Sequence, residues 1–150
     1  MTDQEIVIEP MKREHLSQVL AIERASYPDP WSQNAFLKEL SSSGISVPIV
    51  ARREGTVLGY IVAWFVVDEA HIGNVAIANE YRRQGLGRRM MTWLLDHAVE
   101  RGCTFSTLEV RLSNIPAQRL YESFGFEPVS LRKGYYTHPV EDAVVMLKVM

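Results

Sequence analysis

Asn74-Val75-Ala76-Ile77 and, after four intervening residues, Arg82-Arg83-Gln84-Gly85-Leu86-Gly87 are the most informative segments of this 150-residue chain. The first segment predicts an apolar strand, and the second predicts a basic turn that contains two glycines. An amphipathic helix follows at once, because apolar side chains recur at helical spacing at Leu86, Met90, Leu94 and Ala98. A strand, a glycine-containing turn and a helix in this order predict a phosphate-binding site at the start of the helix.

Three features of the turn favour an anion. Glycine lacks a Cβ and accepts a positive φ, so the backbone can come close to the ligand. The first N–H groups of the helix are unpaired, and the helix dipole adds partial positive charge. Full charges come from Arg82, Arg83, Arg88 and Arg89. The turn lacks the Gly-Lys-Ser/Thr ending of a Walker loop and the three-glycine spacing of dinucleotide-binding turns, and a plain helix N-terminus is the alternative interpretation.

The rest of the sequence predicts an α/β fold in which a mixed sheet carries helices on both faces. Strands are expected at residues 6–8, 49–51, 57–67, 70–77, 107–112, 127–131 and 143–149. Helices are expected at 16–23, at 33–40 after an N-cap at Ser32, at 86–98, and at 115–124 after a cap at Ser113 or Asn114. Residues 41–44 should end the second helix. An antiparallel meander joined to a strand–helix–strand unit predicts a sheet of about seven mostly antiparallel strands.

Length, charge and cysteine content limit the possible functions. A chain of 150 residues fits one domain, expected to span 1–150. The net charge of −2 gives no general attraction to nucleic acid or anionic membranes, and no apolar run approaches the roughly 18 residues of a membrane span. Residues 1–5 lack a signal-peptide core, and Cys103 is the only cysteine. We expect a cytoplasmic monomer or weak dimer, and no metal, because the histidines match no ligand spacing.

The phosphate turn resembles one of a known family. Arg82-x-x-Gly85-x-Gly87 after the Asn-Val-Ala-Ile strand is similar to the acetyl-CoA pyrophosphate site of the GNAT acetyltransferase superfamily. Asn114 and Tyr121, at the start and middle of a later helix, resemble the second cofactor motif of that superfamily. The resemblance implies the GNAT fold and acetyl-CoA as acetyl donor. The implied cofactor-binding residues are Val75, Ala76, Ile77, Arg82, Arg83, Gln84, Gly85, Leu86, Gly87, Arg88, Asn114, Ala117 and Tyr121.

Five further segments are similar to one branch of the superfamily, the RimI family of bacterial ribosomal-protein-alanine N-acetyltransferases. They are Pro30-Trp31-Ser32, Asp68-Glu69-Ala70, Leu108-Glu109-Val110-Arg111, Leu120-Tyr121-Glu122-Ser123-Phe124-Gly125-Phe126 and Tyr135-Tyr136. This resemblance covers nearly the whole chain. It implies that acetyl passes by direct attack, in a ternary complex, to a protein N-terminal α-amine. The first candidate is the N-terminal alanine of the eighteenth small-subunit ribosomal protein.

Two residues are candidates for proton transfer. An α-amine has a pKa of roughly 8 and must lose a proton before it attacks, and a carboxylate within reach can take that proton. The resemblance implies Glu109 as this base; an exposed strand glutamate, or one paired with Arg111, is the alternative. A phenol, with a pKa near 10, can protonate a departing thiolate. The resemblance implies Tyr121 as this acid; a core aromatic is the alternative.

Backbone and aromatic groups are expected to complete the site. If the strand splays as in the GNAT superfamily, an N–H group near residues 75–77 should stabilise the carbonyl oxygen, and the same residues should pair with the pantetheine arm. An ordinary core strand is the alternative. Rigid aromatics suit a peptide-binding surface, although core or loop packing is an equally simple interpretation. The expected acceptor walls are Tyr27, Trp31, Tyr135 and Tyr136. Pro116 and a short 136–141 segment depart from the RimI pattern, and His71 and His97 are expected to be structural.

The sequence therefore predicts an acetyl-CoA-dependent N-acetyltransferase whose partners are acetyl-CoA and the N-terminal segment of a protein, with no nucleic acid or membrane. Two alternatives remain. One is a GNAT enzyme that acts on a small amine, an antibiotic or a lysine side chain, which the aromatic acceptor walls disfavour. The other is a CoA-binding sensor or interaction module without turnover, which the joint presence of Glu109 and Tyr121 disfavours.

Overall fold

A computed structural model describes residues 5–41 and 44–150 of the chain. Two expectations concern residues outside these ranges. They are the absence of a signal-peptide core at residues 1–4 and the role of Ser42 and Ser43 in ending the second helix. No helix in the described ranges is long and apolar enough to cross a membrane.

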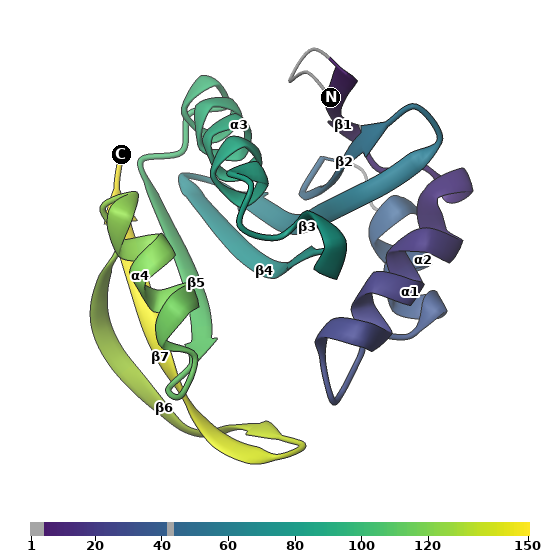
Figure 1. Cartoon of the computed structure of the whole chain (residues 1–150). Helices are drawn as coiled ribbons and strands as arrows, with labels where there is room; N and C mark the ends of the chain where they lie inside the picture. The colour runs from purple at the N-terminus through teal and green to yellow at the C-terminus, as the bar shows by residue number, and fades with distance from the viewer. Residues whose placement is uncertain (1–4, 42–43) are drawn as a thin grey trace.

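Seven strands form one sheet in the order β1-β2-β3-β4-β5-β7-β6 (Figure 1). They are β1 (Ile6–Pro10), β2 (Ser46–Arg53), β3 (Thr56–Val66), β4 (Glu69–Ile77), β5 (Phe105–Arg111), β6 (Glu127–Thr137) and β7 (Val140–Val149). Every neighbouring pair is antiparallel except β4 and β5, which are parallel because α3 connects them. The predicted mixed, mostly antiparallel sheet is confirmed.

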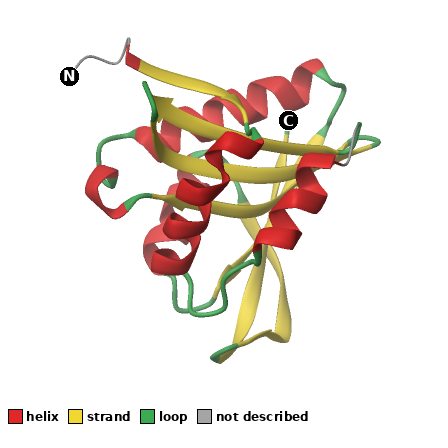
Figure 2. Ribbon diagram, turned by 90° about the vertical axis from the view of Figure 1, so that its right-hand side faces the viewer, coloured by secondary structure: helices red, strands yellow, loops and turns green. Residues whose placement is uncertain are grey.

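Helices cover both faces of this sheet, as expected (Figure 2). They are α1 (Leu16–Ser26), α2 (Gln33–Ser41), α3 (Leu86–Glu100) and α4 (Ile115–Ser123), with 3₁₀ turns η2 (Arg13–His15) and η3 (Asn79–Tyr81). On one face α1 and α2 bury Val19 and Phe36 against Tyr60. On the other, α3 buries Met90 and Leu94 in the main core, against which α4 also packs. Periodic apolar positions on each helix therefore supply two cores.

Helix starts agree with the expected caps, whereas strand ends do not. The Ser32 hydroxyl accepts a bond from Ala35 N–H at 3.1 Å, and Asn114 Oδ1 accepts one from Ala117 N–H at 3.2 Å. The last two strands are longer than predicted, because β6 continues to Thr137 and β7 begins at Val140. Nearly every β6 side chain is exposed, so no alternation of apolar and polar residues marks this strand in the sequence.

Strands β4 and β5 separate part-way along their length. Their pairing runs from Glu69↔Phe105 to Ile72↔Leu108 and goes no further in the described residues. The β3–β4 register shifts between Val62 and Ala63, which leaves Gly73 as a bulge; a bulge bends its strand and increases the local twist. Residues 75–77 consequently pair with β3 alone, and the edge of β4 that faces β5 is open (Figure 1).

The Trp64 ring occupies the space that a side chain at position 73 would fill. A Cβ at position 73 would lie 1.9 Å from Cζ3 and 2.2 Å from Cη2 of Trp64. The indole packs against Trp31, with ring centroids 6.2 Å apart, and against His71, with centroids 5.5 Å apart. Its Nε1–H donates to Glu39 at 2.6 Å. The absence of a side chain in the bulge therefore allows one aromatic ring to join the second helix to β4.

We predict that Gly73→Ala lowers the free energy of unfolding by about 1–3 kcal/mol, because the added methyl group displaces a ring held by three contacts. Urea denaturation followed by tryptophan fluorescence measures this change. Gly55→Ala is the matched control, because a Cβ there meets no atom within 4 Å. Equal stability of the two variants would contradict the prediction.

Candidate functional site

The predicted phosphate turn begins α3, and only one of its two glycines needs its conformational freedom. Gly85 is the N-cap and has a φ of 79° in the left-handed region, which a side chain would strain. Gly87 lies in the first helical turn, where an added Cβ would meet Leu120 at an ordinary 3.8 Å. The first N–H groups of α3 have no partners within the helix, so they can bind an anion.

The arginines of the turn differ in what they bind. Arg82 donates to the carbonyl of Ile77 at 3.0 Å and to the hydroxyl of Ser26 at 3.3 Å. Arg88 donates to the Ser123 hydroxyl at 3.0 Å and lies over the Phe124 ring. These two side chains fasten the turn to α1, β4 and α4. Arg83 is exposed and has a positive φ of 63°.

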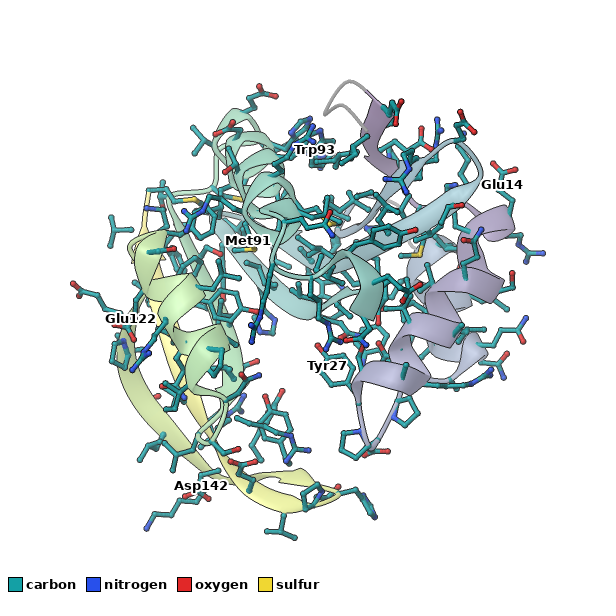
Figure 3. The ribbon with its side chains drawn as sticks, in the orientation of Figure 1. Glu14, Tyr27, Met91, Trp93, Glu122 and Asp142 are labelled. Carbon is teal, nitrogen blue, oxygen red and sulfur yellow. The ribbon has the colours of Figure 1, made fainter. Side chains whose placement is uncertain are left out.

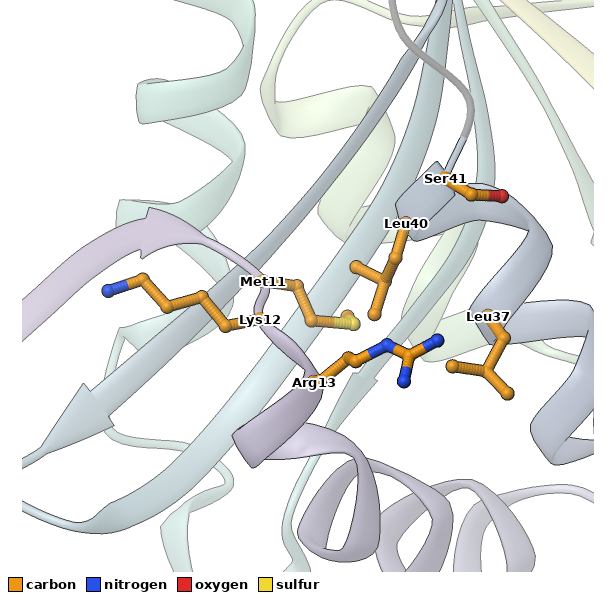
Figure 4. Close-up of a pocket in the computed structure, with 6 residues that line it drawn as sticks. All are labelled: Met11, Lys12, Arg13, Leu37, Leu40 and Ser41. Carbon is orange, nitrogen blue, oxygen red and sulfur yellow. The ribbon is translucent and has the colours of Figure 1, made fainter.

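Two hollows lie near the helices. One, of about 410 Å³, adjoins the phosphate turn; its lining includes Gly85, Arg88, Arg89 and Trp93. The other, of about 220 Å³, lies between η2 and α2 and is lined by Met11, Lys12, Arg13, Leu37, Leu40 and Ser41 (Figure 4). Only the first includes residues that the sequence predicts to bind the cofactor.

A histidine on the neighbouring strand binds the carboxylate of Glu109. His71 Nε2 lies 2.8 Å from Glu109 Oε1, and the Tyr135 hydroxyl donates to the same oxygen at 3.4 Å. The bond to His71 is the main reason that the pKa of Glu109 lies below its usual value, and it also raises the pKa of His71. Arg111, the alternative partner, binds Glu141 instead at 3.2 Å. Glu109 is therefore an ionised carboxylate with a defined direction.

Tyr121 lies on the inner side of α4, where it packs against the main core. Its ring meets Phe126 edge-on, with centroids 6.1 Å apart. Burial raises the pKa of Tyr121 to about 12, so the phenol keeps its proton at neutral pH. A protonated hydroxyl at this position can act as a proton donor.

Tyr27 lies between the end of α1 and the open edge of β4 (Figure 3), where its hydroxyl donates to the carbonyl of Val75. Burial is the main reason that the pKa of Tyr27 is raised, with further contributions from Tyr121 and Tyr136. The three phenols, which come from separate segments, are thus within electrostatic reach of one another. A carbonyl oxygen has two lone pairs, so Val75 can still accept one bond from a ligand.

A buried carboxylate supports the loop that carries Tyr27 and Trp31. Glu23, on α1, is 1% exposed. Its Oε1 accepts bonds from the Tyr60 hydroxyl on β3 and from Asn74 Nδ2 on β4, the latter at 2.8 Å. Its Oε2 accepts the N–H of Trp31 at 2.9 Å. One side chain therefore joins α1, two central strands and the loop before α2.

The Tyr135–Tyr136 pair lies on the β6–β7 ribbon, and Arg111 holds the turn of that ribbon. The guanidinium donates to the carbonyls of His138 and Pro139 at 3.2 and 3.0 Å and lies 4.2 Å from the centroid of the Tyr136 ring. The turn consists of His138 and Pro139 alone, because β6 ends at Thr137 and β7 begins at Val140. The predicted short connection is therefore a tight, anchored turn.

The structure adds residues that the sequence pattern did not indicate. Glu23, Trp64, His71 and Gly73 all lie close to predicted site residues, although none belongs to a motif. The sequence predicts a structural role for His71, and the structure adds that its ring contacts the candidate base directly. The strand that carries His71 pairs in parallel with the strand that carries Glu109, and His71 lies opposite Thr107. This pairing brings His71 close to Glu109.

Other candidate chemistries receive little support. No group of three or more His, Cys, Asp or Glu residues within 5–41 and 44–150 could hold a metal ion. Cys103 is buried, and burial raises the pKa of its thiol, which disfavours the reactive thiolate. Pro116 is accommodated in the first turn of α4, where proline is tolerated.

The chain is similar in sequence and in structure to known acetyltransferases. Residues 16–126 match the acetyltransferase (GNAT) family. A Bacillus subtilis (strain 168) protein, provisionally named [ribosomal protein bS18]-alanine N-acetyltransferase, is 39% identical over 91% of this chain and 90% of its own length. The Escherichia coli (strain K12) protein named for the same activity is 35% identical over 83% and 84%. A crystal structure of the ribosomal-protein-S18-alanine N-acetyltransferase from Escherichia coli superimposes with a TM-score of 0.87 at 32% identity, covering 96% of this chain and 93% of that one.

We predict that Glu23→Gln lowers the free energy of unfolding by about 1–3 kcal/mol. An amide has one oxygen, so at least one of the three converging donors would face its NH₂ group. Urea denaturation at pH 7 measures the loss. Glu14→Gln is the control, because Glu14 is exposed (Figure 3) and surface changes cost about 0.5 kcal/mol or less. A loss no greater than that of the control would show that the Glu23 network does not stabilise the fold.

Proposed function

We propose that this chain, which belongs to the acetyltransferase (GNAT) family, acetylates the N-terminal α-amino group of a protein. It is an acetyl-CoA-dependent N-acetyltransferase. The first candidate acceptor is the N-terminal alanine of ribosomal protein bS18. The observation that carries this proposal is the 39% identity, over nine-tenths of both chains, with a relative named for that activity. The predicted family, fold class and acetyl donor are confirmed.

The residues at the split between β4 and β5 suit acetyl-CoA. The first N–H groups of α3, the left-handed Gly85 and the exposed Arg83 would receive the pyrophosphate. The open edge of β4 at residues 75–77 would pair with the amide groups of the pantetheine arm as an added strand does. We assign Asn114, Ala117 and Tyr121 to the same ligand, because Leu120 of α4 lies beside Gly87 of α3 and Tyr121 is within electrostatic reach of Tyr27.

Two side chains are assigned to proton transfer. Glu109 takes a proton from the acceptor ammonium group, which leaves the nitrogen lone pair free to attack the thioester carbonyl. Its fixed orientation and ionised state support this role. Tyr121 gives its proton to the departing thiolate, and its position on the inner side of α4 and its protonated phenol support this role. A backbone N–H of residues 75–77 would stabilise the oxyanion.

The acceptor would lie between the loop after α1 and the β6–β7 ribbon. Tyr27, Trp31, Tyr135 and Tyr136 are assigned as its walls, because Tyr27 and Tyr136 are within electrostatic reach and Tyr135 contacts Glu109. Trp31 also packs against Phe36, so it serves the second core as well. Rigid aromatic walls suit a peptide better than a small flexible amine.

The proposed acceptor also bears on the cellular location and assembly state of the enzyme. A ribosomal acceptor would place it in the cytoplasm, where ribosomal proteins are made. We propose one domain that spans 1–150 and acts as a monomer or weak dimer without direct contact with nucleic acid. The single continuous sheet and the net charge of −2 support these assignments.

We predict that a peptide with a free N-terminal alanine is acetylated at least about tenfold faster, by kcat/KM, than free lysine or a polyamine, because only the peptide fills the aromatic walls. The same peptide with a blocked N-terminus is the control and should not react. Mass spectrometry of ribosomal proteins from cells with and without the gene identifies the natural acceptor. Equal rates on lysine would favour a small-amine enzyme, and CoA binding without any transfer would favour a sensor.

We predict that Tyr121→Phe lowers kcat by about 10²-fold, because the departing thiolate loses its proton donor. The affinity for acetyl-CoA, measured by calorimetry, should change little, since the ring remains. Tyr81→Phe is a control on η3 that keeps the same chemical change away from α4. Unchanged turnover would remove Tyr121 from the acid role.

A further inference from the structure

Trp64, His71 and Glu109 form a row where β4 and β5 separate. Glu39 on α2 fixes the Trp64 indole through Nε1–H, and the indole packs on the His71 ring at 5.5 Å with 30° between the planes. On its other side, His71 Nε2 lies 2.8 Å from Glu109 Oε1. The imidazole is therefore held between an anchored ring and a carboxylate. The bonds that Glu109 accepts from His71 and Tyr135 both go to Oε1.

We infer that His71 is a positioning residue for acetyl transfer, whose Nε2–H holds one oxygen of Glu109 so that the other is directed to the acceptor amine. The inference rests on the proposed function, because Glu109 must receive the proton of that amine. In this step the ammonium N–H bond breaks, its electron pair stays on nitrogen, and a new O–H bond forms at Glu109 Oε2. His71 keeps its own proton throughout.

His71 also controls how strong a base Glu109 is. A neutral imidazole only donates a hydrogen bond, whereas an imidazolium pairs with the carboxylate and weakens it as a base. The other groups that face the pair are Glu69 on β4 and Arg132 and Tyr135 on β6. The bond to Glu109 is the largest influence and raises the pKa of His71 above its usual value of about 6.5. The base therefore gains strength as the pH rises through neutrality.

Kinetics of two variants test the inference. His71→Phe keeps a ring beside Trp64 but removes the donor, and we expect kcat to fall about tenfold at pH 8, with KM for acetyl-CoA unchanged. His71→Gln can restore part of kcat through its amide donor. His97→Phe is the matched control, because His97 also stacks on a tryptophan, Trp93, and its Nδ1–H donates to the Trp93 carbonyl at 2.8 Å, on α3 and not beside Glu109. It should keep full activity.

A pH profile separates positioning from a structural role. The kcat/KM ratio of wild type to His71→Gln, measured on one acceptor, cancels the ionisation of the acceptor amine. We expect this ratio to rise about threefold or more between pH 6 and pH 8, since one pH unit changes the neutral fraction of a protonated imidazole about tenfold. A flat ratio, with wild type active, would overturn the inference and leave the proposed function intact.

Nuclear magnetic resonance of the histidine ring nitrogens measures the titration of His71 beside Glu109 without any need for turnover. In wild type the His71 titration midpoint should lie higher than in Glu109→Gln, because the variant removes the carboxylate. The His97 signals serve as an internal reference. Equal midpoints in the two proteins would overturn the inference, and so would a His71 that carries its proton on Nδ1. Absence of acetyl transfer to the alanine peptide, to lysine and to a polyamine would overturn both this inference and the proposed function.

Discussion

Beyond Ile72 and Leu108, strands β4 and β5 no longer pair, and the arrangement of the site follows from this separation. An open strand edge in the middle of a sheet leaves backbone donors and acceptors that a ligand can satisfy. The Gly73 bulge supports the separation, because it bends β4 and makes room for the Trp64 ring. The phosphate turn and Glu109 both lie at this opening.

The two sides of the opening differ in how firmly they are held. One is the loop after α1, and the other is formed by α4 and the β6–β7 ribbon. Glu23 is buried with three hydrogen bonds and fixes the loop that carries Tyr27 and Trp31 to β3 and β4. A carboxylate removed from water is costly unless such donors surround it, so its partners are held in defined positions. On the other side, α4 has no fully buried residue, and the β6–β7 ribbon depends on Arg111 for its turn. Fewer buried side chains therefore fix this side of the opening.

Periodicity and short motifs predicted much of this molecule. The helices, their caps at Ser32 and Asn114, the strand order of the meander and the phosphate turn all depend on contacts between near neighbours in sequence, which leave a local pattern. The ends of β6 and β7 could not be predicted, because an exposed two-stranded ribbon has no buried face to produce alternation. Of the two glycines in the turn, Gly85 has a positive φ and Gly87 does not, a difference that the sequence pattern could not show.

The sequence identified the acetyl donor, because the residues that hold a phosphate or cap a helix are close together along the chain. The two candidate proton carriers came from the resemblance to the RimI family. The sequence did not identify the partners of those residues. His71 and Glu109 are 38 positions apart, Glu23 and Asn74 are 51 apart, and Tyr27 and Val75 are 48 apart. Contacts of this kind depend on which strands become neighbours and where they separate. Packing of the whole sheet therefore decides how the Glu109 carboxylate is oriented and lowers its pKa.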